Sequence, residues 1–262
     1  RSWRSHRGCR WARQPLYSGA MVKPRTPDAR APRTPFPWLL LAVVFAFWWS
    51  GVGTLWRSSH WAHYTYLADA FLHGQLALVR TPNDAGDMAP VGQKLYVVFG
   101  PLPALLLMPL VPLFARGTPD VLVLALTALL GVWAFHALLA RLHGTREPAR
   151  LACATLTFAL GTAMHYGAAM GNVWLHAQIT ATVLQVCALL AAANGRALAT
   201  GVLFGLTVLT RPTTTLAAPF AAWLLWSRHE REPQAAAPGL RKWLALGVPI
   251  VAAAALHAVY NR

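Results

Sequence analysis

Charged residues are scarce in this sequence, and acidic residues are the scarcest. Of 262 residues, 12% are charged and only eight are Asp or Glu, whereas 56% are apolar. This balance excludes an ordinary soluble domain and is typical of a polytopic membrane protein. Several apolar windows approach the roughly 20 residues that a helix needs to cross a bilayer, where few other spanning structures are stable. We therefore predict an all-α fold, a transmembrane helical bundle.

Cysteine is also rare, which excludes a disulfide framework. Cys153 and Cys187 lie in apolar segments and Cys9 lies in a basic leader, so no pairing is indicated. His60 and His63, three residues apart, have a spacing that zinc ligands use. No matching set of acids or cysteines accompanies them, so side chains at the membrane interface are the better interpretation. No internal repeat is evident.

Positive charge is abundant, and its distribution indicates orientation. The net charge is +15, and nine of the 23 Lys and Arg residues lie in the first 37 positions, with most others flanking apolar segments. Such flanking charge orients spans and does not by itself predict a nucleic-acid partner. We predict that residues 1–37 form a disordered, basic cytoplasmic leader. Met21 is the expected start, with residues 1–20 as translated upstream sequence or, alternatively, an organelle transit peptide.

The spans are predicted from apolar segments with short links between them. The first covers residues 38–56. The later ones cover residues 121–140, 151–167, 173–193, 197–210, 213–226 and 243–260. We expect the fifth and sixth of these seven to be short spans that meet at Arg211-Pro212, because one continuous span would hold Arg211 near the bilayer centre.

One apolar segment, residues 95–115, differs from the predicted spans because four prolines interrupt it: Pro101, Pro103, Pro109 and Pro112. The links 141–150, Arg196 and 227–242 together hold eight Lys or Arg residues. If segment 95–115 crossed the membrane, these links would lie outside, against the positive-inside rule. Proline also removes a helix hydrogen-bond donor, which hydrocarbon tolerates poorly. We therefore predict a broken juxtamembrane helix in a long external loop, residues 57–120, with the amino terminus inside.

The loop opens with an amphipathic stretch, SSHWAHYTYLADAFLHGQLALV. We expect Ser58 or Ser59 to cap a helix there and Gly74 to end it. One side of this helix is apolar, while Thr65, Asp69 and His73 recur at spacing four on another. Asp69 could act as a general base beside the membrane. The alternative is a solvated carboxylate paired with His73.

Two further groups of polar residues are candidates for binding. Asp84 and Asp87 lie in a turn-rich loop with Lys94 nearby. They could hold Mg²⁺ or Mn²⁺, act as a base and a sugar-hydroxyl acceptor, or be solvated turn formers. His165 and His176, within MHYGAAMGNVWLHAQ, suit a sugar or a lipid head group, with anchoring in the aromatic belt as the alternative.

Four cations are predicted on the outer side: Arg211, Lys94, Arg80 and Arg116. A lipid-borne phosphate needs charge-assisted donors, and Arg offers a bidentate pair. Arg211, beside the break between two spans, is the first choice for this role. An ordinary charge at a helix end is the alternative.

Five features in the same order resemble a known family. They are YLADAFLHGQL, the downstream Asp87, GQKLYVVFGPLPALLLMPLVPLF, GTAMHYGAAMGNVWLHAQ and GLTVLTRPTTTLAAPF, which together cover most of residues 38–262. This pattern resembles GT-C membrane glycosyltransferases, especially the bacterial branch related to protein mannosyltransferases and lipid A aminoarabinose transferases. Members are usually longer, so residues 38–262 would form the amino-terminal portion of a GT-C-like domain. The family often has FPP where this chain has Phe99-Gly100-Pro101.

The resemblance implies an inverting glycosyltransferase of the bacterial cytoplasmic membrane. It would move a sugar from a polyprenyl-phosphate donor to a lipid or glycan acceptor on the outer face. Asp69, or alternatively Asp87, would be the base, and Arg211 with Lys94 would bind the phosphate. Tyr96, His165 and His176 would line the sugar or head-group pocket, with His73 and Asp84 as further binding candidates. No organic cofactor or nucleic acid is implied, and divalent metal use stays open. A transporter or flippase is the main alternative, and an outer-face acyltransferase or ligase shares the topology.

Overall fold

The computed structural model describes residues 36–51, 55–82, 86–143, 147–228 and 239–261. Most of the predicted leader, the loop acid Asp84, and Arg262 lie outside these ranges. The described part of the chain is mostly helical. Three of its helices are long and apolar enough to cross a membrane: α5 (Asp120–His143), α8 (Val173–Ala193) and α12 (Leu240–Tyr260).

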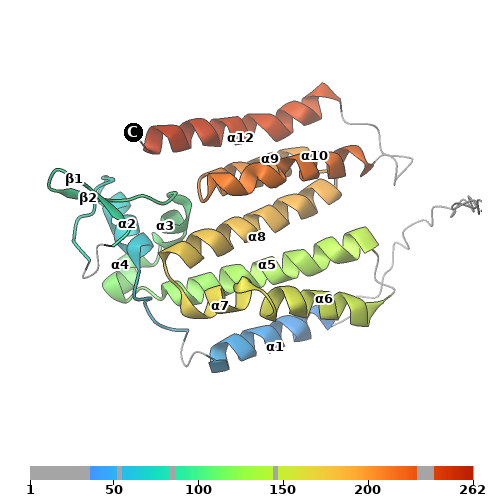
Figure 1. Cartoon of the computed structure of the whole chain (residues 1–262), viewed down its shortest axis with the longest axis horizontal. Helices are drawn as coiled ribbons and strands as arrows, with labels where there is room; N and C mark the ends of the chain where they lie inside the picture. The colour runs from blue at the N-terminus through green and yellow to red at the C-terminus, as the bar shows by residue number, and fades with distance from the viewer. Residues whose placement is uncertain (1–35, 52–54, 83–85, 144–146, 229–238, 262) are drawn as a thin grey trace, which may run out of the picture. The chain divides into compact units, whose positions relative to one another are not determined.

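Shorter helices complete the bundle. They are α1 (Phe36–Gly51), α6 (Pro148–Leu160), α7 (Ala163–Met170), α9 (Ala197–Val208) and α10 (Ala218–Trp226), the last preceded by the 3₁₀ turn η2 (Pro212–Ala217). In Figure 1 the helices lie side by side, and α5 packs on α8, α8 on α9, and α9 on α12. The predicted break at Arg211-Pro212 is present, since α9 ends before it, but the predicted 213–226 span begins with η2 and only residues 218–226 are α-helix. The predicted 151–167 helix is instead two helices, because Gly161 ends α6 and the Thr162 hydroxyl caps α7 by accepting from the Met164 N–H at 3.2 Å.

The two ends of the bundle differ in chemistry. At one end lie the segments between α1 and α5, together with the turn between α9 and η2 (Figure 1). The helix ends that carry the basic links lie at the other end. The described cations there are Arg141, Arg150, Arg196, Arg228, Arg241 and Lys242. This is the charge distribution expected if segment 95–115 does not cross the bundle.

Segment 95–115 is broken into short pieces. It contains most of strand β2 (Lys94–Val97), then α3 (Leu102–Leu107), α4 (Val111–Phe114) and the start of the 3₁₀ turn η1 (Ala115–Gly117). A six-residue helix is only about 9 Å long, so α3 cannot cross a bilayer. Pro101 is the N-cap residue of α3 and Pro112 lies in the first turn of α4, where a missing N–H costs little. The predicted break is therefore present, but residues 95–97 are strand rather than helix.

Strand β2 pairs with β1 (Met88–Val91) in an antiparallel hairpin that we did not predict from the sequence. Gly92, with φ of 61°, occupies the first position of its two-residue turn, a conformation that favours glycine. Pro90 pairs with Leu95 across the hairpin. On the other side of β2, the Leu78 N–H donates to the Leu95 carbonyl at 2.9 Å.

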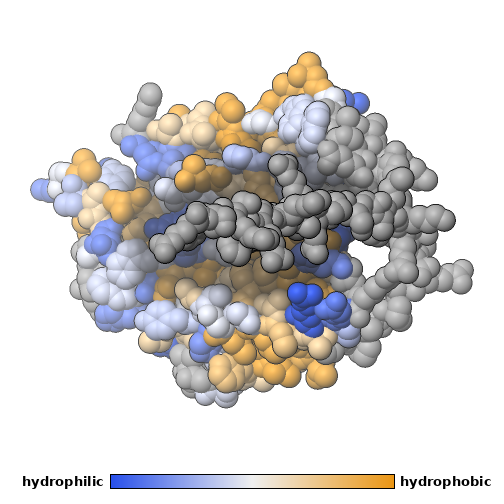
Figure 2. All heavy atoms as spheres, turned by 45° about the vertical axis from the view of Figure 1, so that its right-hand side comes forward, coloured by the Kyte–Doolittle hydropathy of each residue, from blue (hydrophilic) through white to orange (hydrophobic). Residues whose placement is uncertain are grey.

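The interior is apolar, and much of the exterior is apolar as well. One core cluster includes Trp48 of α1, Leu124 of α5 and Val183 of α8, and another includes Phe204 of α9 and Leu224 of α10. Hydrophobic side chains also dominate the upper and lower margins in Figure 2, where α12 and α1 lie in Figure 1. Exposed apolar residues such as Phe47 and Val251 suit contact with lipid.

Candidate functional site

The candidate site is built on helix α2 (His63–Leu72), which lies at the end of the bundle away from the basic links. Its predicted apolar side is confirmed, since Tyr64, Leu67 and Ala68 are buried in a cluster with residues of α3 and α8. His73 follows the helix, and Gly74, with φ of 69°, ends it as expected. The face that carries Thr65 and Asp69 is therefore held in a fixed direction.

The predicted capping of α2 by Ser58 or Ser59 is wrong. The N-cap residue is Ala62, with no side-chain cap. Ser59 instead donates its backbone N–H and its hydroxyl to the carboxylate of Asp120, at 2.7 and 2.5 Å. Asp120 lies at the start of α5 and is 2% exposed. A buried carboxylate loses more free energy without hydrogen-bond donors than the amino-terminal end of α2 loses without a side-chain cap.

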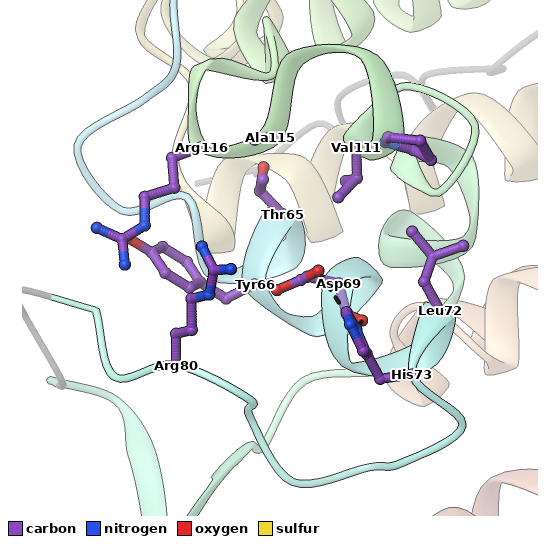
Figure 3. Close-up of a pocket in the computed structure, with 10 residues that line it drawn as sticks. Thr65, Tyr66, Asp69, Leu72, His73, Arg80, Val111, Ala115 and Arg116 are labelled. Atoms are coloured by element: carbon purple, nitrogen blue, oxygen red, sulfur yellow. Dashed lines mark hydrogen bonds and ion pairs between the residues drawn. The ribbon is translucent and has the colours of Figure 1, made fainter.

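A pocket of about 350 Å³ lies over the Asp69 face of α2. We call it the Asp69 pocket, and its walls come from α2, the segment around residue 80, α4 and η1. It is lined by Thr65, Tyr66, Asp69, Leu72, His73, Arg80, Val111, Pro112, Ala115 and Arg116. Figure 3 shows Arg80 and Arg116 together with Tyr66 on one side, Asp69 in the middle, and Leu72 with Val111 on the other side. The pocket is thus cationic at one side and apolar at the other.

Asp69 is partly shielded and has a histidine partner. Its side chain is 25% exposed, and the His73 Nδ1 lies 3.5 Å from the Asp69 carboxylate and 2.8 Å from the Asp69 backbone oxygen. The predicted Asp69–His73 pairing is therefore present. However, α4 and η1 cover this face of the helix, so Asp69 is not the solvated carboxylate of the simpler interpretation.

The two arginines of the pocket have unpaired side chains in the described part of the chain. Within the described ranges, neither Arg80 nor Arg116 makes a hydrogen bond or an ion pair, and both are exposed. Thr65 lines the same pocket with its side chain 4% exposed and its hydroxyl without a partner among these residues. Exposed guanidinium groups are donors from which a phosphate oxygen can accept hydrogen bonds.

Arg211, which the sequence predicts as the main phosphate-binding residue, does not line the Asp69 pocket. It ends the α9 segment, is partly buried, and donates through Nη1 to the Gln178 side-chain oxygen. Arg211 is near Tyr64, which lies on the core side of α2. The Tyr64 hydroxyl is buried without a hydrogen-bond partner in the described structure. Burial raises the pKa of Tyr64 well above its usual range; Tyr260 also raises it, and Arg211 lowers it. The hydroxyl is therefore neutral at physiological pH.

The other predicted site residues do not line the Asp69 pocket. Lys94 and Tyr96 lie on β2, and Asp87, with φ of 63°, is exposed just before β1. His165 of α7 packs its ring against Phe47 at 5.3 Å. His176 is buried in α8, where its Nε2 lies 3.0 Å from the Asp120 backbone oxygen. The remaining candidate, Asp84, is outside the described residues.

Arg80 and Arg116 line the pocket, whereas the sequence predicts them only as cations on the outer side. Both were recognised as outer cations, but neither lies in a motif, and 36 positions separate them in the sequence. A signal was available in that these two and Lys94 are the only Lys or Arg residues between positions 58 and 140. Among the described residues, no three His, Cys, Asp or Glu side chains lie close enough together to hold a metal ion.

Comparisons of the chain with protein-family models, curated proteins and solved structures found no match. A function must therefore be inferred from the chemistry of the site. The Asp69 pocket combines a carboxylate, two unpaired guanidinium groups and an apolar wall. Such a combination can accept a proton from a nucleophile while holding a phosphate that carries a lipid.

Proposed function

We propose that this protein is a membrane glycosyltransferase that uses a polyprenyl-phosphate sugar as donor. The reaction would take place in the Asp69 pocket, on the outer face of the bacterial cytoplasmic membrane, with the amino terminus inside. The observation that carries the proposal is the meeting of Asp69 with unpaired Arg80 and Arg116 in one pocket. The resemblance of the sequence to GT-C enzymes supplies the reaction class.

The proposed reaction is an inverting displacement at the anomeric carbon. Asp69 accepts the proton of an acceptor hydroxyl or amine as that group forms its bond to the sugar. The bond between the anomeric carbon and the phosphate oxygen breaks, and its electron pair leaves with the lipid phosphate. Arg80 and Arg116 stabilise the negative charge that develops there, which is the largest electrostatic change of the reaction.

The shape of the pocket supports a lipid-linked donor. Leu72 and Val111 face the arginines across the pocket, so a phosphate at the cationic side leaves the apolar side for the first isoprene units. His73 lies beside the Asp69 carboxylate, with its Nδ1 3.5 Å from Oδ1, and its ring makes a hydrogen bond to the Asp69 backbone oxygen. A cationic side opposite an apolar side suits an amphiphilic ligand better than a small soluble one.

A transporter is the weaker proposal. The sequence favours a transporter only through Arg211, a charged residue in an interrupted span, because broken helices and midplane charges mark transport sites. Arg211 instead lies in the turn at the end of α9, at the same end of the bundle as α2 (Figure 1). The carboxylates Asp69, Asp87 and Asp120 also belong to that end rather than to the middle of the spans.

The test is sugar transfer in membranes that contain the full chain. Polyprenyl-phosphate carrying radiolabelled mannose or aminoarabinose serves as donor, and labelled covalent product is counted. Asp69→Asn is expected to lower transfer by about 100-fold or more, the scale of a general base. Asp87→Asn, a matched change outside the pocket, is expected to leave it near the wild-type rate.

Two results would overturn the proposal. Transfer that persists in Asp69→Asn would remove the base, and movement of donor across the bilayer with no covalent product would favour a flippase. Orientation is checked separately by labelling with an impermeant thiol reagent in right-side-out vesicles of a variant that lacks the native cysteines. A cysteine at Ala89 should react there, whereas a cysteine at Arg150 should react only after the vesicles are opened.

A further inference from the structure

A second cavity, of about 580 Å³, opens at the basic end of the bundle. It lies between the first turns of α9 and α12, far along the bundle from the Asp69 pocket (Figure 1). Its walls are Gly195, Arg196, Ala197, Leu198, Ala199, Arg241, Lys242 and Ala245. We call it the α9–α12 groove. It plays no part in the proposed transfer reaction.

The charge of the groove is all of one sign. Arg196, Arg241 and Lys242 are exposed, and none of their side chains has a hydrogen-bond or ion-pair partner among the described residues. No Asp or Glu is among the lining residues. By contrast, Arg150, at the same end of the bundle, is paired with Glu147 at 3.2 Å. Three unpaired cations around one cavity favour an anionic ligand.

The backbone adds to this preference. Arg196 is the N-cap residue of α9 and Gly239 that of α12, and neither helix has a side-chain cap. The free N–H groups of a first helical turn attract anions, and two helices begin at this groove. A phosphate group matches both the guanidinium donors and the helix starts.

The groove is also preformed. Helix α9 approaches α12 closely at Gly201, where an added Cβ would meet the backbone oxygens of Ala245 and Leu246. At Gly205 an added Cβ would lie 2.8 Å from the Pro249 oxygen. Close backbone contact at Gly201, beside the groove, and at Gly205, one turn further along α9, fixes the distance between the two helix starts.

The remaining walls indicate where the anion comes from. Leu198 is exposed beside the groove, and Leu240 and Leu244 are exposed on the same end of α12. The ligand therefore meets apolar surface next to the cations, as a lipid head group with its acyl chains would. Basic pockets between helices at the cytoplasmic surface are sites for anionic lipids. We propose that the α9–α12 groove binds the phosphate of an anionic phospholipid of the inner leaflet.

The test is a thermal-shift titration of the purified full chain in neutral detergent. Short-chain phosphatidylglycerol is compared with phosphatidylcholine of the same chain length and with inorganic phosphate. Phosphatidylglycerol is expected to raise the unfolding temperature saturably, and the other two are not. Arg241→Gln should weaken the apparent affinity by about fivefold, the scale of one basic residue at a membrane surface. The double variant Arg196→Gln/Arg241→Gln should weaken it further.

Arg150→Gln is the matched control, because it removes one charge from the same end of the bundle outside the groove. It is expected to leave the apparent affinity unchanged. Unfolding temperatures without lipid show whether each variant is folded. Equal stabilisation by phosphatidylcholine, or equal loss in Arg150→Gln and Arg241→Gln, would overturn the proposal. Equal stabilisation by inorganic phosphate would overturn the lipid assignment in favour of a soluble anion.

Discussion

Ser59 donates two hydrogen bonds to the carboxylate of Asp120, although 61 residues separate them in the sequence. The backbone oxygen of the same aspartate lies 3.0 Å from the His176 Nε2. Asp120 thus joins the segment before α2 to the starts of α5 and α8. This junction helps to hold α2, and with it the Asp69 carboxylate, at its end of the bundle.

Removing the Ser59 hydroxyl should therefore destabilise the fold. Ser59→Ala leaves a buried carboxylate short of one donor, which costs about 1–3 kcal/mol in free energy of unfolding. Ser58→Ala is the matched control, because Ser58 makes no hydrogen bond in the described structure. The unfolding temperature in detergent should fall for Ser59→Ala only. Equal behaviour of the two variants would contradict a structural role for the Ser59–Asp120 pair.

The pocket arginines should determine donor affinity. A hydrogen bond to a charged group contributes about 1.5–3 kcal/mol, so Arg80→Gln or Arg116→Gln should raise the KM for the polyprenyl-phosphate donor by roughly 10- to 100-fold. Lys94→Gln tests the prediction made from the sequence, since Lys94 is on the hairpin and outside the pocket. Steady-state kinetics should show little change for it. A larger effect from Lys94 than from either arginine would place the phosphate elsewhere.

Gly100 should not tolerate a side chain. An added Cβ would meet the backbone oxygens of Leu209 and Thr210, and the Leu102 N–H donates to the Leu209 oxygen at 3.3 Å beside it. Gly100→Ala must push α3 away from the end of α9, and overpacking of this kind costs about 1–3 kcal/mol. Gly117→Ala has open space around its Cβ and serves as control. The unfolding temperature should fall for Gly100→Ala and stay near the wild-type value for Gly117→Ala.

The Tyr64 hydroxyl should contribute nothing to stability. It is buried without a described hydrogen-bond partner, so Tyr64→Phe is expected to keep or slightly raise the unfolding temperature. Tyr260→Phe removes a donor to the Val97 oxygen at 3.3 Å and should cost about 0.5–1.5 kcal/mol. A larger loss of stability in Tyr64→Phe than in Tyr260→Phe would show that the Tyr64 hydroxyl has a partner.

The same tyrosine predicts a pH effect. Its pKa in the folded chain is raised above the usual 10.0, so the folded protein keeps this proton where the unfolded chain loses it. Stability should therefore fall as the pH rises above 10.0. Tyr64→Phe should make this fall shallower, which unfolding curves at alkaline pH would measure. An identical pH dependence in wild type and variant would contradict the raised pKa.

The helices of the bundle were largely predictable, because each depends on a local pattern. The predicted 173–193 helix has the same bounds as α8, since Asn172 caps it and an apolar run fills it. The turn at Arg211-Pro212 was also predicted, from the cost of a charge in hydrocarbon. The break at Gly161 and Thr162 was missed because apolar residues continue on both sides of it.

The site was less predictable, because its members meet only through tertiary contacts. Asp69 and His73 were found by helical spacing, which fixes their neighbourhood locally. Arg80 and Arg116 become neighbours only because α2, α4 and η1 fold over one another. Ser59 resembled a helix cap in sequence, and only the position of Asp120 shows its partner. Long-range hydrogen bonds of this kind leave no periodic pattern in a sequence.

Pro90 has a consequence for contacts between copies of the protein. The Leu95 carbonyl points away from β1 and accepts a hydrogen bond from the Leu78 N–H. Leu95 and Pro90 are therefore a non-hydrogen-bonded pair of the hairpin, and the Pro90 nitrogen points away from β2, toward the outer edge of β1. Proline has no N–H to offer there. The edge of β1 is therefore a poor template for another strand, and the hairpins of two copies are discouraged from joining into a shared, aggregating sheet.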